Sequence, residues 1–131
     1  MINPFKVGDV KAHQFQVLES DVAQFETGLV HSVCSTFKLA KEMEWSSRLF
    51  VLEMCEESEE AVGTRLEINH QSPAFIGDEV EVLATIESLE KNELICSIQV
   101  KVGEQLIASG KTGQKILSKE KINRIFSRLE E

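Results

Sequence analysis

Three side chains in this sequence can act together in acyl transfer. Thr36 supplies a hydroxyl, Glu44 a carboxylate and His70 an imidazole. Nucleophilic acyl transfer needs a nucleophile or a group that holds one, a base, and a residue that orients the base or moves its proton. Histidine is the side chain best suited to proton transfer near neutral pH. The elements that carry these three residues decide whether they can form a site.

Each of the three also has an ordinary structural role. A hydroxyl at Thr36, where a loop becomes a helix, can cap the helix by accepting a hydrogen bond from a free N–H group. Glu44 lies eight residues later, about 12 Å along the helix axis, and can be a glutamate at the edge of the core. His70 ends a predicted strand just before Pro73, at a break that can aim a side chain into a site. A lone histidine is more often structural.

One long helix carries Thr36 and Glu44. Residues 37–54 contain neither glycine nor proline, and Ser35 or Thr36 can cap their first turn. Apolar residues lie on more than one side of this helix, which predicts that it is buried. Before it, residues 7–18 predict a strand, and residues 20–35 predict an irregular segment with a short helix at 21–27.

The rest of the chain predicts strands. Apolar and polar residues alternate at 62–70, 79–89, 94–102 and 105–117, with turn residues between them. One strand, a long helix and four further strands indicate an α+β fold. We expect the hotdog fold, an antiparallel sheet wrapped around a long central helix. Residues 118–131 predict an amphipathic helix, docked on the body or on a partner, and residues 1–131 predict a single domain.

Charge and cysteine content exclude several classes of function. The net charge is −8, which disfavours nucleic acid as a partner. The three cysteines include no CxxC pair, so we predict no metal site, no disulfide scaffold and a reducing compartment. Neither a signal peptide nor a membrane span is visible. We expect a cytoplasmic protein without a membrane partner or cofactor.

Two stretches resemble the fluoroacetyl-CoA thioesterase family of hotdog proteins. In that family a threonine precedes the central helix, and a glutamate follows eight residues later in a Met-Glu-Trp-like context, as Thr36 and Glu44 do here. Gly63-Thr64 followed by His70 resembles the family's Gly-Thr strand that ends in histidine. The similarity runs from about residue 7 to residue 117 and includes the small-residue segment 107–111.

This resemblance implies a function and a set of site residues. Thr36, Glu44 and His70 would form the catalytic set, and Gly63 would offer its N–H to the acyl group. A homodimer with active sites near the subunit interface is also implied. We therefore expect an acyl-CoA thioesterase that hydrolyses a small or medium acyl-CoA. The alternative is a non-catalytic acyl-CoA-binding or regulatory hotdog dimer.

The sequence departs from the family in two places. The fluoroacetyl-CoA enzyme has a lid rich in aromatic residues before its threonine. Residues 27–35 contain none, and Phe25 is the nearest. This argues against fluoroacetyl-CoA as the substrate. Residues 111–115 stand where the family often has a histidine and an arginine, so we assign them no role.

Overall fold

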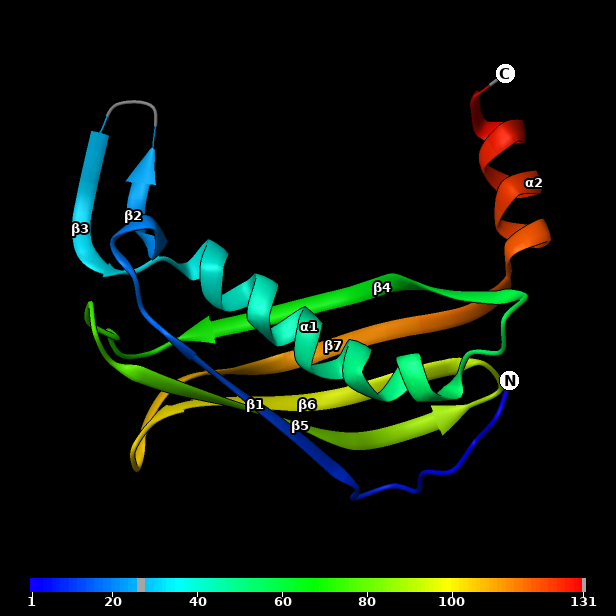
Figure 1. The fold of residues 1–131 in the computed structure, drawn as a ribbon, viewed down its shortest axis with the longest axis horizontal. Coiled ribbons are helices and arrows are strands. Elements are labelled where there is room, and N and C mark those ends of the chain that lie inside the picture. Colours follow the sequence, from blue (N-terminus) through cyan, green and yellow to red (C-terminus); the bar gives the residue numbers. More distant parts are fainter. Residues whose placement is uncertain (26–27, 131) are drawn as a thin grey trace.

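A five-stranded antiparallel sheet carries one long helix on one face in the computed structural model, which describes residues 1–25 and 28–130 (Figure 1). The sheet order is β1-β5-β6-β7-β4. The strands are β1 Val10–Gln16, β4 Glu59–His70, β5 Glu79–Glu90, β6 Glu93–Val102 and β7 Gln105–Ser118. The predicted α+β hotdog arrangement is therefore confirmed, with β1 shorter and β4 longer than the alternation suggested.

The long helix α1 spans Thr36–Met54. Its N-cap is Ser35, whose hydroxyl accepts a hydrogen bond from the Lys38 N–H at 3.0 Å. Of the two predicted caps, Ser35 therefore takes the role, and the Thr36 hydroxyl is free for other contacts.

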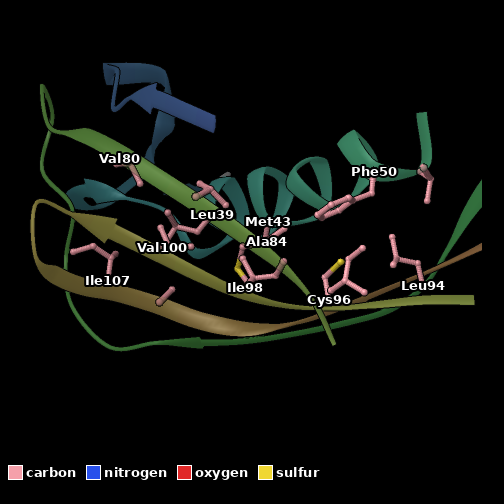
Figure 2. Close-up of a cluster of buried hydrophobic side chains, with 14 of the residues drawn as sticks. Leu39, Met43, Phe50, Val80, Ala84, Leu94, Cys96, Ile98, Val100 and Ile107 are labelled. Carbon is pink, nitrogen blue, oxygen red and sulfur yellow. The ribbon is translucent and has the colours of Figure 1, made fainter. Parts of the chain in front are cut away.

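One face of α1 forms the core with the sheet. Figure 2 shows Leu39, Met43 and Phe50 of α1 directed toward apolar residues of the strands, such as Ala84 and Ile98. All of these side chains are at most 1% exposed. Full burial of one large apolar side chain contributes about 1.5–3 kcal/mol. This packing fixes the helix over the centre of the sheet.

The opposite face of α1 is open, so the predicted burial of this helix holds for only one of its faces in the single chain. Phe37 is 85% exposed, Trp45 44% and Leu52 53%. These residues are spaced by about two helical turns and share one side of the helix. An exposed apolar stripe of this kind is typical of an interaction surface.

A hairpin precedes α1, where we predicted an irregular segment with a short helix at 21–27. Strand β2 (Val22–Phe25) pairs with β3 (Gly28–Cys34) after a short 3-10 turn, η1, at Glu19–Asp21. The helix prediction is wrong for the described part of that range; residues 26 and 27 lie outside the described residues. The Cys34 N–H donates to Ala74 O at 2.8 Å, which ties the hairpin to the loop after β4.

Strand β4 carries a bulge that changes which face its residues occupy. Gly63 pairs with Gln114, whereas Arg65 pairs with Gly113, so Thr64 is an extra residue in the ladder. Regular alternation would put Gly63 and His70, seven residues apart, on opposite faces. The bulge restores them to the same face, toward α1.

Two features at the edge of the body remain uncovered. Strand β4 pairs with β7, and no second neighbour lies along it among residues 1–25 and 28–130. Leu66 on this strand is 48% exposed. Helix α2 (Lys119–Glu130) follows β7 and rises away from the sheet (Figure 1). Within α2 only Ile122 is buried, so the helix does not dock along its length on its own chain.

Candidate active site

The Thr36 hydroxyl contacts the His70 ring directly. Thr36 Oγ1 lies 2.9 Å from His70 Nδ1, within hydrogen-bonding distance. Thr36 is exposed at the start of α1, and His70 is half-buried at the end of β4. A hydroxyl beside an imidazole is the arrangement by which a base takes a proton from a nucleophile or from water held in its place.

Backbone hydrogen bonds fix the position of the chain around His70. The N–H groups of Gln71 and Ser72 both donate to Ile107 O, at 2.8 and 3.1 Å. These bonds end β4 and turn the chain toward Pro73. A depression of about 250 Å³ opens beside the imidazole; its lining residues are Val33, His70, Gln71, Ser72 and Pro73. The imidazole is thus accessible from solvent at a fixed position.

Glu44 and Gly63, the other two predicted site residues, also lie together and form a second pair. A Cβ built on Gly63 would stand 2.6 Å from Glu44 Oε1. The carboxylate therefore occupies the space that any larger residue at position 63 would fill. The sequence predicted Glu44 in buried surroundings, but it is exposed and lines an open cleft of about 370 Å³ with Lys41 and Trp45 among its neighbours.

Gln114 on β7 fixes the part of α1 that carries Glu44. It is 1% exposed and donates to Ser47 Oγ at 2.8 Å and to Glu44 O at 3.3 Å. It also pairs with Gly63 in the sheet. Gln114 therefore connects both members of the second pair. No role was predicted for residues 111–115, although a polar residue at an inward position of the strand marks Gln114 in the sequence.

The two pairs do not meet within one chain. Thr36 and Glu44 are separated by about 12 Å of helix rise. Among the described residues, no hydrogen bond joins the Glu44 carboxylate to Thr36 or His70. One chain thus presents a hydroxyl–imidazole pair and a separate carboxylate–glycine pair along the same helix face.

A charged cluster lies on the other flank of α1. His13 Nε2 is 2.9 Å from Glu42 Oε2, and Lys38 Nζ is 2.9 Å from Glu42 Oε1. Burial raises the pKa of the Glu42 carboxyl, but the hydrogen bonds and charge interactions with Lys38 and His13 together outweigh it, and the net pKa is lowered. The cluster joins β1 to the first turns of α1. His13 therefore has a structural contact on this flank.

The described residues give little support for a cysteine nucleophile, a metal site or a membrane-spanning helix. Burial raises the pKa of the Cys34 and Cys96 thiols to about 12, which makes them poor nucleophiles at neutral pH. Residues 1–25 and 28–130 contain no group of three His, Cys, Asp or Glu side chains arranged to hold a metal ion. No described helix is long and apolar enough to span a bilayer.

Comparison with known proteins identifies the family. The profile of FlK, described as fluoroacetyl-CoA-specific thioesterase, matches residues 17–120. This chain belongs to the FlK family. The family consists of thioester hydrolases, so its members are enzymes of the kind that the resemblance implied. A comparison with curated proteins gives no significant match.

Solved structures of family members and relatives have the same fold. A hypothetical protein of Thermus thermophilus, a thioesterase superfamily member, is 32% identical with a TM-score of 0.92, covering 98% of this chain and 96% of that one. The fluoroacetyl-CoA thioesterase FlK is 22% identical with a TM-score of 0.87, covering 96% and 98%. A hot-dog-like protein from Thermanaerovibrio acidaminovorans is 22% identical with a TM-score of 0.85, covering 95% and 93%.

Proposed function

We propose that this protein hydrolyses the thioester of a small or medium acyl-CoA to the free acid and CoA. Membership of the FlK family supports thioester hydrolysis. Variants of FlK have been solved with fluoroacetate and CoA, and with acetyl-CoA. The observation that carries the proposal for this chain is the 2.9 Å contact between Thr36 Oγ1 and His70 Nδ1, made while Ser35 serves as the helix cap.

In the proposed reaction, His70 acts as the base. When Nδ1 carries no proton, the Thr36 hydroxyl donates to it, and either this hydroxyl or a water in its place can attack the thioester carbon. The C–S bond then breaks, and the thiolate of CoA takes up the proton from His70. Attack by water gives the free acid directly, whereas attack by the hydroxyl leaves an acyl ester on Thr36, which a water molecule activated by His70 then hydrolyses to the free acid. Backbone donors such as the Gly63 N–H would stabilise the oxyanion; one such donor accelerates acyl transfer by about 10²–10³-fold in a well-studied case.

The separation of the two pairs supports a homodimer as the active form. Strand β4 lacks a second neighbour among the described residues, and long unpaired edges are normally covered. Antiparallel pairing of two β4 strands brings the Gly63 end of one chain toward the His70 end of the other. Glu44 and Gly63 of one subunit would then complete the site that contains Thr36 and His70 of the second.

Less direct features support our proposals for the acyl group of the substrate and for the cellular compartment. The absence of aromatic residues from 27–35 argues for an acyl group other than fluoroacetyl. All three cysteines, Cys34, Cys55 and Cys96, are free. Free thiols are typical of a reducing compartment, so we place the protein in the cytoplasm.

A thiol-release assay across acyl-CoA chain lengths tests the proposed function. We expect turnover that collapses in Thr36→Ala, Glu44→Gln and His70→Ala while the circular dichroism spectrum is retained. His31→Ala, at an exposed histidine on β3, is the matched control and should remain active. Equal turnover by His70→Ala and the wild type would refute the assignment. Binding of acyl-CoA without release of thiol would instead support the non-catalytic hotdog dimer.

A further inference from the structure

Helix α2 has a positive flank in a protein that is otherwise acidic. Lys121, Arg124 and Arg128 are spaced by three and four residues, which places them on one side of the helix. They line a shallow groove of about 180 Å³ together with Ile125. The helix contains four basic and two acidic residues, whereas the whole chain has a net charge of −8. Among residues 1–25 and 28–130, none of the three cations forms an ion pair.

The apolar side of α2 needs a partner. Ile125 is 37% exposed, Phe126 54% and Leu129 77%, and these residues continue the stripe that begins at the buried Ile122. An isolated helix of about 12 residues is only marginally stable in water. A surface that covers this stripe would therefore stabilise the helix as well as bury its apolar side chains.

The register of the sheet indicates which surface covers the apolar stripe of α2. Ser118, the last residue of β7, pairs with Glu59, the first residue of β4. Helix α2 therefore begins beside the Glu59 end of the uncovered β4 edge (Figure 1). When two β4 strands pair antiparallel, this end lies next to the His70 end of the second copy. The helix then stands beside the partner's hydroxyl–imidazole pair.

We infer that α2 packs its apolar stripe on the second subunit and presents Lys121, Arg124 and Arg128 to the phosphates of the acyl-CoA bound at that subunit's Thr36 and His70. This inference rests on the proposed function. CoA carries a diphosphate and a 3′-phosphate, separated from the thioester by the pantetheine arm. An acidic protein repels such a ligand unless cations are placed locally. Arginine is well suited to phosphate because its fork of N–H donors matches the phosphate oxygens.

An anionic bilayer surface has the same phosphate chemistry and is the competing ligand. A basic flank beside an apolar stripe also suits membrane adsorption. The net charge of −8 opposes approach to an anionic surface. The position of α2 at the end of β4, beside the site, favours the soluble substrate.

Steady-state kinetics on the full-length protein test the inference. The triple variant Lys121→Gln, Arg124→Gln, Arg128→Gln should raise KM for acyl-CoA by about tenfold or more, since charge-assisted bonds to phosphate are lost. KM for the matching acyl-pantetheine, which lacks the nucleotide phosphates, should not change. The control variant Lys91→Gln, Lys101→Gln, Lys115→Gln removes the same charge from turns and strands and should behave as wild type. Equal KM changes for both substrates, or none, would overturn the inference.

Mixed dimers test which subunit α2 serves. A Thr36→Ala chain with a normal α2 is combined with a chain that has Thr36 but the neutralised α2. The second chain alone turns over at the raised KM. If α2 serves the partner, mixing adds activity with the wild-type KM, because the intact Thr36 lies beside the intact helix of the other chain. Activity only at the raised KM would show that α2 acts on its own chain's site and would overturn the inference.

Binding measurements separate this inference from the proposed function. Calorimetry with CoA should show binding to wild type that weakens about tenfold or more in the triple variant. That result without any thiol release would retain α2 as a CoA-binding element and reject the hydrolase. Thiol release by wild type, with CoA affinity and KM unchanged in the triple variant, would retain the hydrolase and reject α2 as a CoA-binding element. Co-sedimentation with phosphatidylserine vesicles that requires the three cations, with KM unchanged, would assign α2 to a bilayer instead.

Discussion

The close approach of Glu44 to Gly63 predicts the effect of adding a single methyl group at position 63. Gly63→Ala adds one methyl group, whose carbon would stand 2.6 Å from Glu44 Oε1. Ordinary contact begins at 3.4 Å, so the carboxylate must move by about 0.8 Å, the difference of the two values. Position 63 has no positive φ, and alanine fits a strand better than glycine by about 0.5–1 kcal/mol. The fold should therefore be retained.

The expected effect is on catalysis. A misplacement of about 1 Å can cost about 10²-fold in rate, which corresponds to about 2.7 kcal/mol of transition-state stabilisation. We expect kcat for acyl-CoA hydrolysis to fall by about 10- to 100-fold in Gly63→Ala, with an unfolding midpoint in urea equal to that of wild type or slightly higher.

A double-mutant cycle identifies the cause of that loss. In a Glu44→Ala background the carboxylate is absent, so Gly63→Ala should reduce the residual rate by less than about twofold. The assay is thiol release at saturating acyl-CoA, with circular dichroism on all four proteins. Wild-type kcat in Gly63→Ala would refute the reasoning. So would a full loss that persists without Glu44, because the methyl group would then act on the substrate directly.

Three further outcomes follow from other contacts. Ser35→Ala removes the cap of α1 and should lower stability by about 1 kcal/mol in urea unfolding; an unchanged midpoint would contradict the cap assignment. Burial works against ionisation of Glu42, but the hydrogen bonds and charge interactions with Lys38 and His13 together outweigh it and leave the Glu42 pKa below its ordinary 4.5. The contribution of the ionised Glu42 to folding stability is present above pH 4.5 and is lost as the pH falls through the lowered pKa. The difference in unfolding free energy between wild type and Glu42→Gln should therefore shrink on acidification. A difference that stays constant would contradict this assignment. Cys34 and Cys96, whose pKa burial raises to about 12, should react with a disulfide reagent at pH near 8 only after unfolding; rapid labelling of the native protein at both sites would disprove this.

The sequence predicted the fold well because the core pattern is regular. Residues 37–54 lack helix breakers, and the structure has a helix over Thr36–Met54. Apolar residues alternate along β5 and β6, and Val80, Ala84 and Ile98 are buried as that alternation requires. Local pattern and tertiary burial agree in these elements, so each supports the other.

The sequence could not predict which apolar surfaces stay open in one chain. Phe37 and Trp45 have apolar side chains like those of the buried residues of α1, but they are exposed. A surface that a second molecule covers looks the same in the sequence as a core. The β2–β3 hairpin was missed for another reason: residues 20–35 show no clear alternation, and its pairing is irregular, with register shifts on both sides of Ala23.

The candidate site was predicted through the family resemblance rather than through pattern. The 34-residue separation of Thr36 and His70 carries no local signal. The bulge in β4 was also hidden, because Val62, Thr64, Leu66 and Ile68 read as one unbroken alternation. The assignment of Glu44 and Gly63 to the same catalytic centre remains a prediction, since the two pairs are apart within the chain.

The β4 bulge has a consequence for insertions and deletions. Thr64 is a single extra residue, and it sets whether the C-terminal half of β4 points toward α1 or away from it. Deleting one residue between positions 63 and 70 would reverse the facing of His70 while leaving its sequence neighbours intact. Length variation among natural relatives should therefore be absent between Gly63 and His70.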